Sequence, residues 1–194
     1  MAGQGVGAGV LRKEDDRLMR GGGQFVADIR LAGMQDVAFV RSPLAHARIV
    51  GIDVPAEFED RVYTVAHLGS VKPGRAVSGL PGFKISEQPI LAQGKVRHVG
   101  ETVAMCVART RAEAEDIAAA VRLDLDEMPV VHDMLLGREP ESARLHEAWS
   151  DNVFLEANVS VGIERVLDAP SKVSRELRTS RQAMAPMEGR GVVA

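Results

Sequence analysis

The chain has 194 residues, which is enough for one substantial domain or for a domain of roughly 120–150 residues with an appended piece. Hydrophobic residues make up 45% and charged residues 26%, which is typical of a globular protein and argues against wholesale disorder. The net charge is −3 without any block of like charge, and aromatic residues are 4%. The sequence therefore offers neither the basic field nor the stacking surface that a nucleic-acid partner needs.

The cysteine count and the apolar runs bear on the compartment. The single Cys106 excludes an internal disulfide and a Cys-only metal site, which favours a reducing compartment. No apolar run approaches the ~20 residues of a membrane helix. The start, Met1–Gly9, has neither the basic nor the apolar region of a Sec signal. We expect a cytoplasmic protein with no membrane partner.

The glycine-rich start predicts a flexible tail over residues 1–11. Its spacing, Gly3-x-Gly5-x-Gly7, is reminiscent of a nucleotide loop, but no strand precedes it and no GKS/T follows. A second glycine run, Gly21-Gly22-Gly23, predicts a tight turn or a close approach to another surface.

Apolar patterns predict several strands in the first third of the chain. Gln35–Arg41 contains a short apolar run suited to a strand buried on both faces. Ala47–Pro55 alternates, which predicts a half-buried strand with Val50, Ile52 and Val54 on one side.

A short strand over Val62–Val65 precedes a stretch rich in Gly and Pro, residues 69–89. Such a composition predicts a long loop, and long loops in compact domains tend to be functional or interfacial.

A strand, a helix and a second strand are predicted over Thr102–Glu127. Thr102–Ala108 is a continuous apolar strand, and Thr110 stands three residues before Glu113, the spacing of a capping box. Helical spacing follows at Ala114, Ile117, Ala118 and Val121. Leu123 and Leu125 then alternate with acidic residues in a strand that ends at Met128-Pro129.

After Pro129 the pattern weakens. Residues 131–151 predict a meandering connector. We expect strands over Asn152–Val161 and Lys172–Thr179 and a short helix over Ile163–Ala169. The last residues, 191–194, are apolar, and we expect a partner chain or a continuation of the chain to complete the structure there.

The sequence contains no motif that identifies an enzyme by itself. The histidines lack the i,i+4 spacing of a helical metal site: His46, His67, His98, His132 and His146. No GxSxG exists for a nucleophile, so the pairs His132-Asp133 and His146-Glu147 are interpreted as ordinary polar loop positions. Cys106 lies within an apolar strand, where a thiol behaves as a small hydrophobe.

A charged segment near the end of the sequence carries Arg181, Glu188 and Arg190. The neighbouring Pro186, Gly189 and Gly191 would fix the backbone and leave the Glu188 carboxylate projecting. From composition alone this segment is a surface loop.

Five ordered segments together resemble a known family. They are Glu14-Asp-Asp-Arg-Leu-Met-Arg-Gly-Gly-Gly-Gln-Phe25; Phe39-Val-Arg-Ser-Pro-Leu-Ala-His-Ala-Arg-Ile49 with Ile52-Asp53; Leu91-Ala-x-x-Lys-Val-Arg-His-Val-Gly-Glu101; Thr110-Arg-Ala-Glu-Ala-Glu-Asp116; and Pro186-Met-Glu-Gly-Arg-Gly191. In this order they are similar to the N-terminal part of the molybdenum-binding large subunit of xanthine dehydrogenase, aldehyde oxidase and carbon monoxide dehydrogenase-type enzymes.

The resemblance implies an α+β fold. It places an α/β-hammerhead domain over residues 12–130, a connector over 131–151 and the opening segment of the molybdopterin-binding domain over 152–194. The family's glycine-rich GGxFGGK-type segment, its pterin-contacting loops and its catalytic glutamate lie beyond this point of the large subunit. The chain is therefore expected to carry no catalytic, cofactor-binding or metal-binding residue of its own. We expect it to be a split or truncated large subunit.

The resemblance also implies a reaction and a set of partners. Such enzymes hydroxylate an aldehyde or N-heteroaromatic carbon with oxygen from water, using Mo-molybdopterin, for which the cytosine dinucleotide form is usual in bacterial relatives. Electrons pass to [2Fe–2S] clusters and FAD on companion subunits. The expected partners are the remainder of the molybdenum-binding subunit, an iron–sulfur subunit and an FAD subunit.

One departure concerns the last motif, where the family often has Pro after the Glu and this chain has Gly189. With that difference, Glu188 is expected as a residue of the substrate funnel wall, and this chain is expected to be mainly structural. The alternatives are a free-standing hammerhead-fold binding or assembly module without a metal centre, and an independent enzyme that uses the histidines or Glu188.

Overall fold

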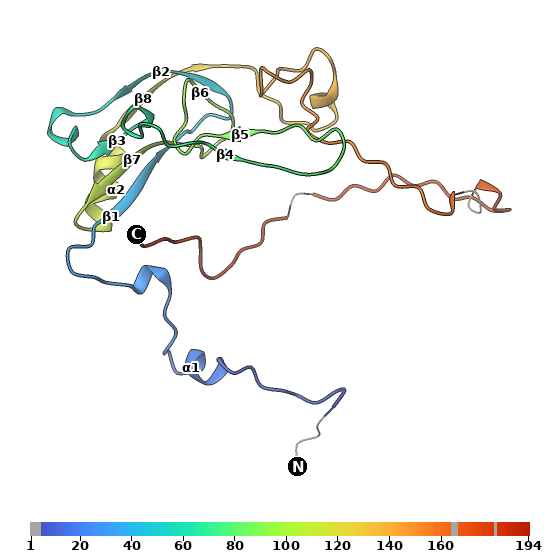
Figure 1. The fold of residues 1–194 in the computed structure, drawn as a ribbon, viewed down its shortest axis with the longest axis horizontal. Coiled ribbons are helices and arrows are strands. Elements are labelled where there is room, and N and C mark those ends of the chain that lie inside the picture. The colour runs from blue at the N-terminus through green and yellow to red at the C-terminus, as the bar shows by residue number, and fades with distance from the viewer. Residues whose placement is uncertain (1–4, 164–166, 181) are drawn as a thin grey trace. The chain divides into compact units, whose positions relative to one another are not determined.

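The computed structural model describes residues 5–163, 167–180 and 182–194, and its contacts divide the chain into two units (Figure 1). One unit is Gln35–Ala169, and the other combines Met1–Met34 with Pro170–Ala194. The predicted boundaries at 11, 130 and 151 stay predictions.

The first sheet has the strand order β1-β7-β3, with β1 at Asp36–Arg41, β7 at Thr102–Ala108 and β3 at Val62–Tyr63. All pairs are antiparallel, and the central β7 places Cys106 opposite both Ala38 and Val62. Helix α2, Arg111–Ala120, packs on β1 and β7 (Figure 1). The core beneath it consists of small and β-branched side chains.

Strand β1 is not buried on both faces, contrary to the sequence-based expectation. Ala38 and Val40 are buried, whereas Phe39 between them is 42% exposed. The reason is that α2 covers only one face of this sheet, so successive side chains of the strand meet the core and solvent in turn.

The second sheet has the order β6-β2-β8, with β6 at Lys95–Val96, β2 at Ala47–Asp53 and β8 at Arg122–Glu127. The register of β2 against β8 shifts between Ile49 and Gly51. Val50 is the extra residue of this bulge and is 61% exposed. The residues that follow a bulge point to the opposite face of the sheet from the one that simple alternation predicts. For this reason Val50 and Ile52 do not lie on the same side, contrary to the prediction.

The start of α2 confirms half of the predicted capping box. The Thr110 hydroxyl accepts a hydrogen bond from the Glu113 backbone N–H at 3.2 Å. The Glu113 carboxylate does not return to Thr110; it accepts from Arg61 Nη1 at 2.7 Å. Ala114 and Ile117 face the core, as the helical spacing predicted.

The predicted long loop, residues 69–89, is a loop except where β4, Gly74–Arg75, pairs with β5, Glu87–Gln88. Its far part is held by Lys84, whose backbone N–H donates to Phe154 O at 2.8 Å and whose ammonium pairs with Asp151 at 2.6 Å. We call residues 69–89 the arm. The predicted strand Val62–Val65 is shorter than expected, since a 3-10 turn begins at Val65.

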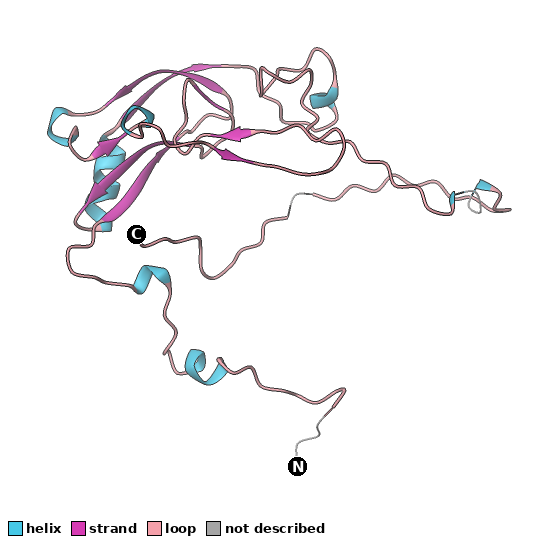
Figure 2. Cartoon of the chain, in the orientation of Figure 1, coloured by secondary structure: helices cyan, strands magenta, loops and turns pink. Residues whose placement is uncertain are grey.

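Beyond Pro129 the connector is irregular apart from a 3-10 turn at Leu136–Arg138. The predicted strands over Asn152–Val161 and Lys172–Thr179 are wrong: both segments lie in the described part of the chain, and both are loop (Figure 2). A strand needs a neighbour for its backbone groups, and none of the described segments pairs with these two. The predicted helix over Ile163–Ala169 includes residues 164–166, which lie outside the described residues.

In the second unit, α1 covers Asp15–Met19 and ends at the predicted glycine turn. Gly21 has φ +71°, and the N–H groups of Gly21 and Gly22 donate to Leu18 O and Arg17 O. This is a Schellman ending, in which a residue with positive φ closes the helix and glycine takes that conformation without strain.

Candidate functional site

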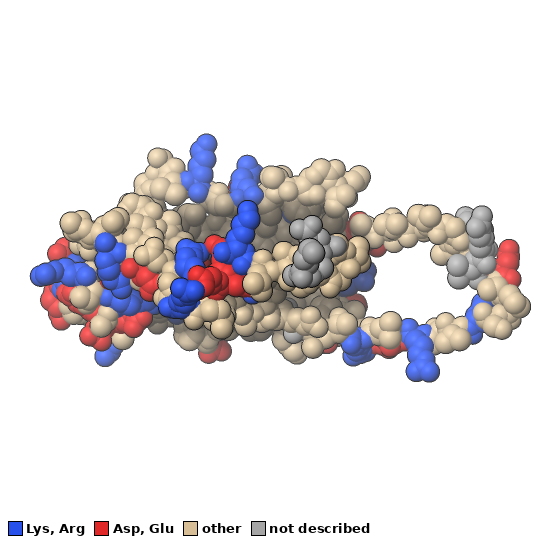
Figure 3. Space-filling model, turned by 90° about the horizontal axis from the view of Figure 1, so that it is seen from below, with Lys and Arg blue, Asp and Glu red and all other residues tan. Residues whose placement is uncertain are grey.

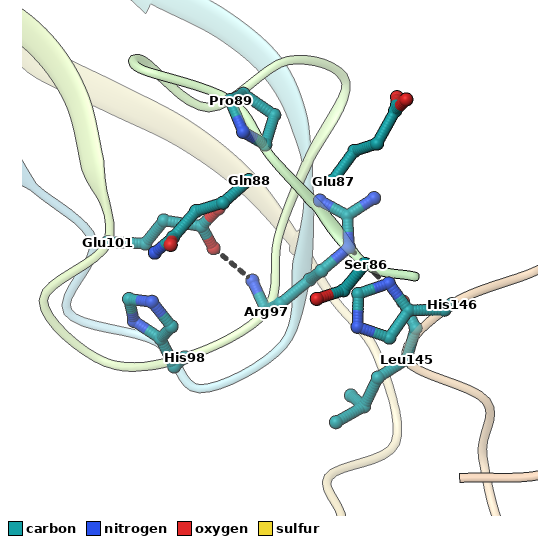
Figure 4. Close-up of a pocket in the computed structure, with 9 residues that line it drawn as sticks. All are labelled: Ser86, Glu87, Gln88, Pro89, Arg97, His98, Glu101, Leu145 and His146. Atoms are coloured by element: carbon teal, nitrogen blue, oxygen red, sulfur yellow. Dashed lines mark hydrogen bonds between the residues drawn. The ribbon is translucent and has the colours of Figure 1, made fainter. Parts of the chain in front are cut away.

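Two hollows flank Arg97, just after β6. The first, about 230 Å³, is lined by Ser86–Pro89 from the arm, by Arg97, His98 and Glu101 from the turn between β6 and β7, and by Leu145 and His146 from the connector (Figure 4). Three segments far apart in the sequence therefore form its wall.

The turn between β6 and β7 holds Arg97 firmly. Its backbone N–H donates to the Glu101 carboxylate, which is buried, and the Glu101 backbone accepts from Ser42 N at 2.9 Å (Figure 4). The guanidinium Nε donates to Leu145 O at 3.2 Å. The Nη1 of the same guanidinium is buried and has no acceptor among the described residues. A desolvated donor without a partner costs free energy, so this nitrogen is an unsatisfied hydrogen-bond donor of the site.

The second hollow, about 280 Å³, is lined by Arg48, Gln93, Gly94, Lys95, Arg97, Met128 and Glu147. Lys95 is only 6% exposed, and its ammonium lies 2.5 Å from Glu147 Oε1 and 3.4 Å from His46 Nε2. His46 Nδ1 lies 2.7 Å from Pro129 O, so Nδ1 donates there and Nε2 is left to accept from Lys95. This chain of contacts ties the connector to the second sheet.

The basic side chains set the protonation of their neighbours. Burial, and then the positive charges of Arg97 and Lys95, lower the pKa of His146. The hydrogen bond from Lys95 is the main cause that lowers the pKa of Glu147. Both shifts favour the neutral imidazole of His146 and the carboxylate form of Glu147 at neutral pH.

Glu188 belongs to the unit made of the two ends of the chain, whereas all residues that line the two hollows belong to Gln35–Ala169. Its Oε1 accepts a hydrogen bond from the Val26 backbone N–H at 2.9 Å, at the first residue of the 3-10 turn Val26–Asp28. A Cβ added to Gly191 would come within 2.7 Å of Val26 Cγ1, so the backbone approaches closely there. Arg181 lies outside the described residues.

The other residues weighed from the sequence occupy separate places. Cys106 is buried in β7, and burial raises the pKa of its thiol, as expected for a packing residue. Among the described residues no group of three or more His, Cys, Asp or Glu side chains is placed to hold a metal ion. None of the helices in the described part combines the length and apolarity of a membrane span. Acidic and basic side chains are interspersed on the face shown in Figure 3.

Sequence reasoning missed Lys95 and Arg97 as site residues. The available signal was Lys95-Val-Arg-His98, in which basic residues flank Val96 shortly before the apolar strand Thr102–Ala108. Burial of Lys95 depends on Glu147, which no local pattern connects to it.

The chain belongs to the aldehyde oxidase and xanthine dehydrogenase family. The family model for the a/b hammerhead domain matches residues 20–129, which contain both three-stranded sheets and α2. The expected family and the mixed α+β fold are thereby confirmed.

Individual relatives and solved structures are also similar to the chain. It is 37% identical over 196 aligned residues to the nicotine 6-hydroxylase large subunit of Paenarthrobacter nicotinovorans, covering 97% of this chain and 24% of that subunit. The crystal structure of quinoline 2-oxidoreductase from Pseudomonas putida 86 matches with a TM-score of 0.69 and 42% identity, over 75% of this chain and 19% of that one. The Cu,Mo-CO dehydrogenase structure in its carbon monoxide-reduced state matches with a TM-score of 0.59 and 32% identity, over 73% and 18%. The chain thus spans about a quarter of the first relative and less than a fifth of the two solved chains.

Proposed function

We propose that this chain is the N-terminal, mainly structural component of a heteromeric molybdenum hydroxylase in the cytoplasm. The observation that carries the proposal is the match to the nicotine 6-hydroxylase large subunit, which covers 97% of this chain. The enzyme would hydroxylate an aldehyde or an N-heteroaromatic carbon with oxygen from water. Its partners would be the remainder of the molybdenum-binding subunit, an iron–sulfur subunit and an FAD subunit.

The cofactor would be held by the remainder of the subunit. Mo-molybdopterin, in its cytosine dinucleotide form, would supply the redox chemistry and the activated water-derived oxygen. The described residues of this chain present no metal-holding group. No hydroxylation step is therefore assigned to a side chain of this chain.

The role proposed for this chain is to present shaped surfaces to those partners. Two sets of contacts fix the arm and the connector relative to the sheets. Lys84 on the arm contacts Asp151 and Phe154, and Lys95 on β6 contacts Glu147. Both segments carry exposed apolar side chains, including Leu80 and Ile85 on the arm. Fixed apolar surface of this kind is what an interface with another polypeptide requires.

We propose in addition that the segment Pro186–Gly191 forms part of the substrate funnel wall, with Glu188 as its charged member. The bond from Val26 N–H would hold this carboxylate in place. Glu188→Gln keeps an oxygen acceptor for Val26 and removes the charge, whereas Glu188→Ala removes both. If Glu188→Gln left turnover of the assembled enzyme unchanged, the funnel role would be wrong.

Metal analysis of the native complex tests the main proposal. The chain is purified gently by an affinity tag from its native source, and molybdenum and iron are measured in what co-elutes. Two [2Fe–2S] clusters and one cofactor predict about one Mo and four Fe per chain, together with larger partners on the gel. A metal-free chain migrating alone would overturn the proposal and support the free-standing binding or assembly module.

A further inference from the structure

Positive charge gathers in the second hollow without matching negative charge. Arg48 on β2 lies opposite Lys95 on β6 in the antiparallel register, where facing Cβ atoms are about 4.5–5.5 Å apart. Arg97 follows two residues later and lines the same hollow. Like charges in facing positions destabilise a sheet unless something lies between them.

The neighbouring carboxylates leave most of this charge uncompensated. Glu147, the single acidic residue of the lining, is already paired with Lys95 at 2.5 Å. Asp126 faces Arg48 from β8, but within the described part of the chain Arg48 forms no ion pair with it or with any other residue. Arg97 Nη1 is buried and lacks an acceptor. Arg48, which is exposed, is therefore the guanidinium available to an added anion, and Arg97 adds a positive charge that no carboxylate compensates.

We propose that this hollow binds a phosphate group, either as inorganic phosphate or as the phosphate of a small organic molecule. Three cations and one carboxylate leave two positive charges, and a phosphate group carries about −1.5 to −2 at pH 7. Guanidinium forks match phosphate oxygens in pairs, and such charge-assisted hydrogen bonds are roughly twice as strong as neutral ones.

The space and the local electrostatics agree with this occupant. A volume of about 280 Å³ admits a tetrahedral oxyanion with several waters, since one water takes about 30 Å³ of liquid. A carboxylate ligand would neutralise one charge where the hollow leaves two. Burial is the first cause that lowers the pKa of His146, and the positive charges of Arg97 and Lys95 lower it further; for Glu147 the first cause is the hydrogen bond from Lys95, and the same two charges add to it.

Calorimetric titration of the full chain with inorganic phosphate is the first test, with AMP as a second titrant. Arg48→Gln removes an exposed cation and should weaken binding by about tenfold, the effect of losing one charge-assisted contact of about 1.4 kcal/mol. Arg122→Gln, on β8 facing Asp53, is the matched control and should bind as the parent does.

Each outcome decides the proposal. Saturable phosphate binding that Arg48→Gln weakens and Arg122→Gln does not would support it, and tighter binding of AMP than of inorganic phosphate would identify an organic phosphate as the source. Absence of binding, or equal loss in Arg48→Gln and Arg122→Gln, would overturn it. Urea unfolding of each variant separates lost binding from lost folding. The titration uses this chain alone, so its result is independent of the metal analysis.

Discussion

The contact between Lys95 and Glu147 predicts which of two substitutions, one at each residue, lowers the free energy of unfolding more. The Lys95 side chain is 8% exposed and the Glu147 side chain 69% exposed, so one end of the pair is desolvated and the other is in water. Removing one partner of a fully buried pair costs about 3–5 kcal/mol, whereas an exposed pair is worth about 0–1 kcal/mol. For Glu147→Gln we expect a loss between these limits, about 1–2 kcal/mol, because it leaves the buried ammonium without a carboxylate.

Lys95→Met should cost less than Glu147→Gln, although it removes the buried member of the pair. The methionine fills a similar volume and needs no counter-charge, so the main loss is the donor to His46 Nε2. That contact is long, at 3.4 Å, which puts its loss at the low end of an ordinary hydrogen bond, about 0.5–1 kcal/mol. In the double variant Glu147→Gln should add almost nothing, because its partner is already gone.

Urea unfolding followed by circular dichroism measures both losses in the full chain. A loss of 1 kcal/mol should also lower the Tm by roughly 2–4 °C at this chain length. The matched control is Arg111→Gln, since its pair with Glu115 is exposed at both ends and should change stability by less than about 0.5 kcal/mol. If Lys95→Met destabilises the chain more than Glu147→Gln, the ammonium is a net source of stability and the reasoning is refuted.

Three further outcomes are expected. Val103→Asp buries an unpaired charge in a fully enclosed position and should abolish folding, with a cost above about 4 kcal/mol, whereas Val50→Asp in the exposed bulge should change the unfolding free energy by less than about 0.5 kcal/mol. Thr110→Ala removes the side-chain acceptor at the start of α2 and should cost about 1 kcal/mol in the same urea experiment; an unchanged midpoint would contradict the cap. Unfolding measured against pH should show stability falling as pH drops below 6.5, because the folded state lowers the pKa of His146 and the unfolded chain then binds the proton more readily. Further losses should follow below pH 4.5 and below pH 3.8, since folding lowers the pKa of Glu147 and brings the pKa of Asp151 to about 2, and His146→Asn should remove only the first step.

The parts of the fold that were predictable from sequence are those with local causes. The strand–helix–strand run over Thr102–Glu127 combines an apolar strand, a cap at Thr110 and a helical stripe, and all three agree with the structure. The bulge at Val50 was not predictable, because alternation continues through it and only the register against β8 reveals the extra residue. The strands expected at 152–161 and 172–179 failed for a related reason: alternation describes how a side chain would face, but a strand also needs a neighbour to pair with.

The candidate site could not be predicted from the sequence, because the burial and pairing of its charged side chains depend on residues far away in the chain. Lys95 in isolation is a surface residue by type, and it is buried here because Glu147, 52 positions away, and His46, 49 positions away, meet its ammonium. A buried cation is tolerated only with such partners, so the connector that carries Glu147 must be in place before the site exists. It follows that any change which detaches the connector should expose Lys95 and lose the second hollow together, without unfolding the first sheet, whose core beneath α2 does not include the connector.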